Sequence, residues 1–158
     1  GHMRVSGKDL TAYNRGRKFV PHVFELSMGV DRSVYVLLEH NLTSDGRRRV
    51  LRLPPFLAPV QVAVLPLVDR DGLPEKATEG YEALRIDFDA VYEADDTIGK
   101  RYRSLDEIGV PFCVTVDYQT LQDDTVTVRD RDTTKQERVP VSELKAWLSR
   151  ALSYPDVR

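Results

Sequence analysis

Cysteine, histidine and long apolar runs are all scarce in this 158-residue sequence. The single cysteine, Cys113, excludes a disulfide framework and is typical of a reducing compartment, so we expect a cytoplasmic protein. No apolar stretch approaches the roughly 20 residues that cross a bilayer, and we expect neither a membrane span nor a secretory leader. Apart from His2, the histidines are His22 and His40, both in the first third of the chain. The rest of the chain therefore has no zinc spacing and no nucleophile–histidine–acid arrangement.

A surplus of positive charge is also missing, because the formal net charge is -2. This excludes a generally basic nucleic-acid coat, and any contact with nucleic acid must come from a local patch. The glycines at positions 72, 80, 99 and 109 stand apart from one another, so the chain has no glycine-rich phosphate loop. We expect one folded domain with an appendage, and no metal site.

Residues 59–158 follow a regular alternation of short apolar runs and amphipathic segments. Apolar or alternating runs predict strands at 60–67, 91–94, 112–116, 125–130 and 136–141. Helices are expected from Pro74 to Phe88, from Ile98 to Ile108, and after Ser142, which is expected to be the N-cap of the last helix. The order βαβαβββα predicts an α/β fold of three layers, with helices on both faces of a mixed five-stranded sheet.

Residues 3–42 are expected to form an appendage to this domain. The extended segment at 17–26 and a helix over 31–40 are together too small to bury their own apolar residues. Residues 43–58, with an Asp45-Gly46 turn, are expected to be a linker. Gly1-His2 before Met3 is typical of the residues left when an affinity tag is removed, so we expect a fragment of a longer protein.

Charged and aromatic residues converge on the expected carboxyl ends of the strands, where an open α/β sheet offers a binding crevice. Arginines suit phosphates and base edges, a carboxylate can accept a hydrogen bond from the amine of cytosine, and tyrosine can stack on a base. The alternatives are a solvated helix face and a salt-bridged hairpin end. The nucleic-acid-binding candidates are Lys100, Arg101, Arg103, Asp117, Tyr118, Arg129, Asp130 and Arg131.

Four segments in this order resemble the glycyl-tRNA synthetase family, in its dimeric class II form. They are KFVPHVFELSMGVDR at 18–32, LAPVQVAVLPL at 57–67, IGKRYRSLDEIGVPFCVTVDY at 98–118 and TVTVRDRDTTKQERV at 125–139. The resemblance implies that 59–158 form the family's anticodon-binding domain, with strand order 2-1-3-4-5. It also implies that 3–42 are the last strand and helix of a class II catalytic core.

The resemblance assigns roles to residues of the appendage as well. Glu25 and Ser27 would bind glycine, and Arg32 would bind ATP, which the parent enzyme uses with Mg to join glycine to its tRNA. Leu26 stands where the family has proline. Because the rest of the catalytic core is missing, we expect the chain to bind tRNA but not to aminoacylate it.

The expected partner is glycine tRNA, whose anticodons end in two cytosines, and the parent is expected to be a homodimer that binds neither DNA nor membranes. An alternative is a non-catalytic synthetase-like accessory protein that acts through protein–protein contacts. A small-molecule binder at the sheet crevice is a third possibility, although the chain has no phosphate loop. Because the rest of the catalytic sheet is missing, we expect the extended segment at 19–26 to have unpaired backbone groups that invite pairing with another copy.

Overall fold

The computed structural model describes residues 4–5, 8–9, 12–14, 17–20, 24–44, 46 and 48–154. The chain divides into two compact units, residues 1–33 and residues 34–158. In the first unit, two short antiparallel pairs are described: β1 (Arg4–Val5) with β2 (Lys8–Asp9), and β3 (Ala12–Asn14) with β4 (Arg17–Phe19). Of the extended segment expected at 17–26, residues 21–23 lie outside the described residues.

Helix α1 (Val30–Asn41) agrees with the helix expected at 31–40 and contains no buried residue. Its exposed apolar side chains within the second unit include Val34, Tyr35, Leu37 and Leu38. A helix normally buries one apolar face, so α1 has an unpartnered face in the described part of the chain.

The second unit is built on the five-stranded sheet that the sequence predicts. Its strands and helices are β7 (Val62–Pro66), α2 (Leu73–Leu84), β8 (Ala90–Tyr92), α3 (Ile98–Ile108), β9 (Phe112–Val116), α4 (Thr120–Asp123), β10 (Thr125–Asp130), β11 (Gln136–Pro140) and α5 (Val141–Ala151). The spatial order is β11-β10-β9-β7-β8. Strand β7 is parallel to β8 and β9, and β10 is antiparallel to β9 and β11. Counted along the chain, this is the order 2-1-3-4-5, which confirms the predicted fold.

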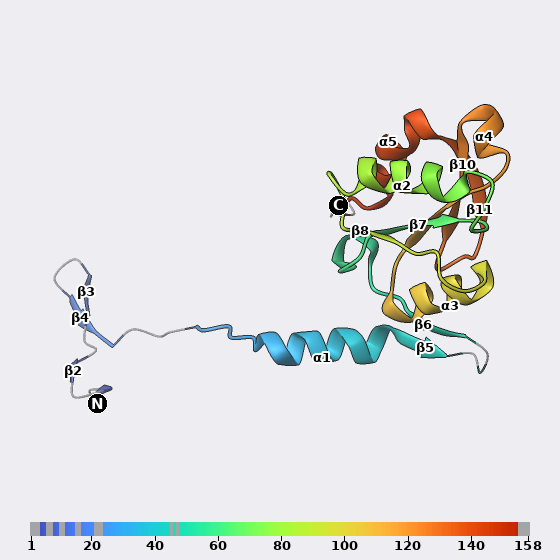
Figure 1. The fold of residues 1–158 in the computed structure, drawn as a ribbon. Coiled ribbons are helices and arrows are strands. Elements are labelled where there is room, and N and C mark those ends of the chain that lie inside the picture. The colour runs from blue at the N-terminus through green and yellow to red at the C-terminus, as the bar shows by residue number, and fades with distance from the viewer. Residues whose placement is uncertain are drawn as a thin grey trace. The chain divides into compact units, whose positions relative to one another are not determined.

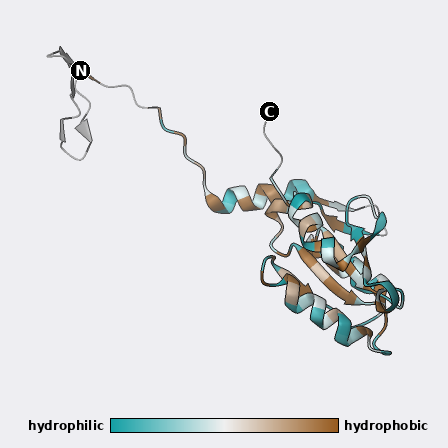
Figure 2. Cartoon of the chain, turned by 90° about the horizontal axis from the view of Figure 1, so that it is seen from above, coloured by the Kyte–Doolittle hydropathy of each residue, from teal (hydrophilic) through white to brown (hydrophobic). Residues whose placement is uncertain are grey.

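Helices α2 and α5 lie on one face of the sheet, and α3 lies on the other (Figure 1). The larger core fills the space under α2 and α5, where β-branched strand residues such as Val64, Val114 and Val128 meet Leu73 and Leu148. The smaller core lies under α3. Strands β7 and β9 are buried on both faces, as their almost continuous apolar runs predict (Figure 2).

Residues 43–58, expected to be a linker, are part of the second unit and pack on its α3. Strand β5 (Leu42–Ser44) pairs with β6 (Arg49–Leu51), and the 3-10 helix η1 (Pro55–Leu57) follows. Val50, Leu51 and Leu53 are buried. The close fit depends on Gly109 at the end of α3, with φ of 86°, because a Cβ atom there would lie 3.0 Å from the carbonyl oxygen of Leu51. The turn chemistry near Asp45 therefore belongs to a β-hairpin.

Two local expectations need correction. Ser142 is not the N-cap of the last helix, because β11 runs directly into α5 and Pro140 takes the cap position. The backbone N–H of Val141 donates to the carbonyl oxygen of Asp124, and the helix starts two residues earlier than expected. The loop expected at 118–124 contains the single turn α4.

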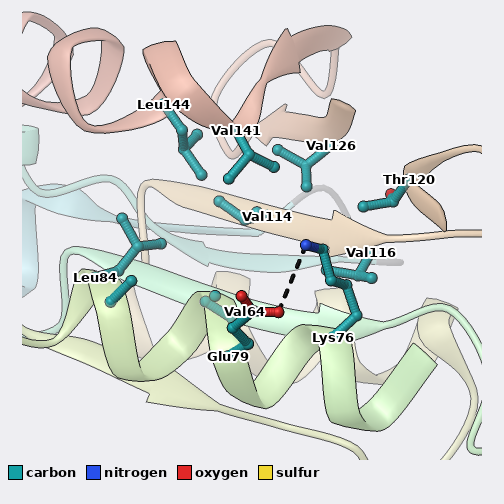
Figure 3. Close-up of a pocket in the computed structure, with 12 residues that line it drawn as sticks. Val64, Lys76, Glu79, Leu84, Val114, Val116, Thr120, Val126, Val141 and Leu144 are labelled. Carbon is teal, nitrogen blue, oxygen red and sulfur yellow. Dashed lines mark ion pairs between the residues drawn. The ribbon is translucent and has the colours of Figure 1, made fainter. Parts of the chain in front are cut away.

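A small cavity of about 90 Å³ lies between α2, α5 and the sheet. Figure 3 shows Val64, Val114 and Val126 among its mainly apolar walls, with the Lys76–Glu79 ion pair, 3.5 Å between Nζ and Oε2, beside it. Its size and apolar lining suit neither a nucleotide base nor a phosphate, so the polar chemistry of the unit must lie elsewhere.

Candidate functional site

The sheet face that carries α3 is covered over only part of its width. Alternation places Thr125, Thr127 and Arg129 on this face of β10, opposite the core residues Val126 and Val128. Strand β11 has its exposed Gln136 and Arg138 next to them. The uncovered part of the face is therefore polar and open to a ligand.

A hollow of about 170 Å³ opens on this face at the edge of α3. Its walls are Leu67, Ile98, Tyr102, Thr115, Asp117, Thr127 and Gln136. The Tyr102 hydroxyl lies 2.7 Å from Thr115 Oγ1, and this bond joins the helix to strand β9. Burial raises the pKa of Tyr102, while the hydrogen bond with Thr115 acts in the opposite direction. We call this region the polar hollow; it presents hydroxyl, amide and carboxylate groups in a small area.

Asp117 lies at the end of β9, where the polar hollow meets the carboxyl edge of the sheet. Arg138 binds it with both terminal nitrogens, and the backbone N–H of Thr120 donates to its Oδ1 at 3.1 Å. Partial burial opposes ionisation, but these hydrogen bonds and the charge of Arg138 outweigh it, so the pKa of Asp117 is lowered. The carboxylate is therefore held ionised and in a fixed orientation.

Tyr118 follows at the same edge and is 42% exposed. Its hydroxyl donates to Asp71 Oδ2 at 2.6 Å, so the loop after β9 is tied to the loop after β7. Asp71 is in the left-handed conformation, with φ of 61°, which is uncommon for a residue with a side chain. Arg70 lies close by, and its interactions with Tyr118 raise the pKa of Arg70. The structure thus brings the loop after β7 and the loop after β9 together at this edge of the sheet.

Three of the predicted binding arginines have their guanidinium groups buried in the unit. Arg101 is 4% exposed and donates to the carbonyl oxygens of Pro66, Glu93 and Leu67. Arg131 is 1% exposed and donates to those of Gly109 and Leu53.

Arg129, the third, makes a two-pronged ion pair with the buried Asp106, at 3.0 and 3.1 Å. Burial alone would lower the pKa of Arg129, but Asp106 raises it above the ordinary value. All three guanidinium groups therefore bind atoms of the protein itself, which leaves them little surface for a ligand.

The remaining predicted residues are spread over different surfaces. Lys100 and Arg103 are exposed on the solvent side of α3, where Lys100 pairs with Asp96 at 3.0 Å. Asp130 is the last residue of β10, away from Asp117, and its Oδ1 accepts from the backbone and side chain of Thr133. Asp130 therefore shapes the β10–β11 turn, and it is not brought together with Asp117.

Glu25, Ser27 and Arg32 are described, and none of them is buried. They precede or begin α1 in the first unit. The described part of the chain also contains no group of three or more acidic, histidine or cysteine residues that could hold a metal ion. Within the same residues, no helix is long and apolar enough to cross a membrane.

Sequence reasoning did not single out Thr127, Gln136 or Arg138, which carry much of the polar face. A signal was present, because β10 alternates polar and apolar residues and its polar side must face away from the core. The sequence could not show that α3 leaves this half of the face uncovered. That follows from the position of the helix over β7 and β9 in the folded sheet.

Fold and site together define an α/β binding module: an open mixed sheet with one polar, partly uncovered face. The family model for the anticodon binding domain matches residues 61–151, which is more than half of the sequence. The chain therefore belongs to the anticodon binding domain family.

Relatives and a solved structure agree with this family. The chain is 50% identical over 147 residues to a glycine–tRNA ligase of Methanothermobacter thermautotrophicus, covering 92% of this chain and 26% of that protein. It is 42% identical over 160 residues to one of Clostridium kluyveri, covering 97% and 34%. The RNA binding domain of threonyl-tRNA synthetase from Cryptosporidium parvum Iowa II has a TM-score of 0.57 and 27% identity over 63% of this chain and 25% of that one. The chain thus spans about a quarter to a third of the curated relatives it matches.

Proposed function

We propose that this chain binds the anticodon stem-loop of glycine tRNA as the anticodon-recognition part of a glycine–tRNA ligase. The observation that carries the proposal is the polar hollow, bordered by the Asp117–Arg138 pair and the exposed ring of Tyr118, on a sheet that belongs to the anticodon binding domain family. Its likeness to the ligases named above supports the choice of glycine tRNA.

The chemistry of the face suits unstacked bases better than a helical backbone. Single-stranded RNA bases are recognised by hydrogen bonds to their edges and by stacking on aromatic rings. Thr127 and Gln136 can donate and accept, and Asp117 can accept from the exocyclic amine of a cytosine. The ring of Tyr118, held by Asp71, offers a stacking surface at the edge.

Electrostatic attraction to phosphates contributes less than the sequence suggests, because three of the predicted arginines are buried. Lys100, Arg103 and Arg70 are exposed, whereas Arg101, Arg129 and Arg131 are buried. About three phosphate contacts give a weak salt dependence, with a log–log slope near -2 to -3. Affinity of the isolated chain should therefore be modest.

The catalytic activity belongs to the whole parent protein under this proposal. The parent would join glycine to tRNA with ATP and Mg, with Glu25, Ser27 and Arg32 contributing to the glycine and ATP sites. In this chain these residues are exposed, and the apolar side chains of α1 are uncovered. This exposure supports the proposal that the chain is a fragment and that the rest of the parent protein packs on α1. We expect no glycyl-adenylate synthesis by the chain alone.

The test is fluorescence anisotropy with a glycine-tRNA anticodon stem-loop, and with the same stem-loop in which both cytosines are replaced by uracil. Arg138→Gln should weaken binding of the first RNA by about tenfold. The matched control is Arg150→Gln, which removes the same charge from α5 on the opposite face and should change affinity by less than about twofold. Equal affinity for both RNAs, or equal effects of both variants, would contradict the proposal.

The uncovered apolar side of α1 favours one other function, a synthetase-like accessory protein that acts through protein contacts. That function predicts stable self-association in sedimentation and no response to the stem-loop. Binding that depends on Arg138 would exclude it as the main role.

A further inference from the structure

A buried cluster connects the polar hollow with the hairpin β5–β6. Its centre is Asp106 on α3, which is 1% exposed. Arg129 from β10 binds both carboxylate oxygens, and Arg48, directly before β6, donates to Oδ2 at 2.7 Å. One carboxylate thus joins three parts of the unit that are far apart in sequence.

The cluster continues to the wall of the polar hollow. The guanidinium carbon of Arg129 lies 4.7 Å from the centre of the Tyr102 ring, within the range of a cation–π contact. Tyr102 and Asp106 are one helical turn apart, so Arg129 is held between them on the same side of α3. The Tyr102 hydroxyl in turn bonds to Thr115 in the polar hollow.

The hairpin is fixed to the same region by further contacts. Arg48 also donates to the carbonyl oxygen of Arg131 at 2.5 Å. Arg52 pairs with Asp132 at 3.4 Å, but it lies at the exposed edge of the contact and does not touch Asp106. Arg48 and Arg52 therefore come from the same segment, but it is Arg48 that bonds to the buried cluster around Asp106 behind the polar hollow.

We propose that Arg129, Asp106 and Arg48 are positioning residues that set the place of Tyr102, and with it the base selectivity of the polar hollow. The inference rests on the proposed function and deepens it. Asp106 holds Arg129 against the Tyr102 ring, and Arg48 makes this arrangement dependent on the docked hairpin. None of the three needs to touch RNA for this role.

Arg129→Lys is the main test, because lysine keeps the charge but cannot both bind Asp106 with two prongs and stack on Tyr102. The matched control is Arg131→Lys, at a buried arginine directly after β10 whose guanidinium bonds to Gly109, Leu53 and Asp132 instead. Both variants of the full chain should lose stability. Only Arg129→Lys should weaken stem-loop binding, by about five- to tenfold, and reduce the preference for cytosine over uracil.

A double-mutant cycle with Tyr102→Leu, which removes both the ring and the hydroxyl, separates positioning from general damage to the fold. If Arg129 acts through Tyr102, adding Arg129→Lys to Tyr102→Leu should change the affinity by less than about twofold. Effects that multiply in the double variant would overturn the inference. So would Arg129→Lys binding RNA as tightly and as selectively as the parent chain.

The part played by Arg48 is tested with Arg48→Gln and the neighbouring control Arg52→Gln. Nuclear magnetic resonance of tyrosine labelled with carbon-13 at the ring should show a shifted Tyr102 signal in Arg48→Gln and an unchanged one in Arg52→Gln. Unchanged Tyr102 signals in both variants would remove Arg48 from the cluster's role. If the parent chain binds no stem-loop, the proposed function fails; if it binds through Arg138 but is insensitive to Arg129→Lys, only the positioning role fails.

Discussion

Replacing Arg131 tests whether the buried arginines hold the fold together or bind a ligand. The guanidinium donates to Gly109 O at 2.9 Å, to Leu53 O at 2.7 Å and to both carboxylate oxygens of Asp132 at 3.0 and 2.8 Å. It joins the end of α3 to the segment after the hairpin. Arg131→Ala removes all of these bonds at once.

The cost can be estimated from these contacts. A hydrogen bond to a charged group contributes about 1.5–3 kcal/mol, and each buried carbonyl left without a donor costs about 1–3 kcal/mol. Removing the guanidinium also removes the cost of burying its charge, which offsets part of this loss. We therefore expect Arg131→Ala to lower the free energy of unfolding by about 3–5 kcal/mol.

Urea denaturation followed by circular dichroism measures this change, and Arg103→Ala is the control. Arg103 is exposed on α3, so its replacement should change stability by less than about 0.5 kcal/mol. The argument would be refuted if Arg131→Ala cost less than about 1 kcal/mol while abolishing stem-loop binding. That result would make Arg131 a direct contact to RNA.

Three other predictions concern single side chains. Gly80→Ala should raise the free energy of unfolding by about 0.5–1 kcal/mol in urea titrations, because Gly80 is inside α2 and a Cβ atom there meets no atom within 4 Å. A loss of stability would show instead that the helix is strained at this position. Because the pKa of Asp117 is lowered by folding, its ionised carboxylate stabilises the fold at pH values above the unfolded pKa, and this stabilisation is lost as the pH falls through the folded pKa. The free energy of unfolding should therefore fall less between pH 6 and pH 3 in Asp117→Asn than in the parent chain, and parallel curves would contradict this. Burial raises the pKa of Cys113 to about 12, so a thiol reagent at pH 8 should label it only after unfolding, and labelling of the native chain at the rate of a free thiol would be the contrary result.

The sheet was predictable because its signals are local. Strands β9 and β10 have the bounds expected from their β-branched runs, and the short connections between elements leave few ways to order five strands. The hairpin β5–β6 was not predictable in the same way. Its turn residues were visible, but the pairing of Leu42 with Leu51 is stabilised by contact with α3, far along the sequence.

The candidate site was predictable in place but not in detail. Asp117 and Tyr118 were expected at the carboxyl edge, and the structure places them there beside the polar hollow. The roles of the arginines could not be assigned from the sequence, because Arg129 shares a strand face with the partly exposed Thr127 and Arg131 directly follows the strand. Burial of the two arginines follows from α3 and the hairpin, which pack over that end of the face.

This distribution of charge bears on how the proposed recognition would work. Three arginines near the site bind Asp106 and backbone carbonyl oxygens, and Arg138 is occupied by Asp117. A surface with few unpaired cations gains little affinity from phosphates, and contacts to phosphates do not distinguish sequences. Under the proposed function, discrimination must therefore come from fixed hydrogen-bonding groups such as Asp117 and from the ring of Tyr118. The buried arginines contribute indirectly, because they fix the strands and the helix that hold those groups in place.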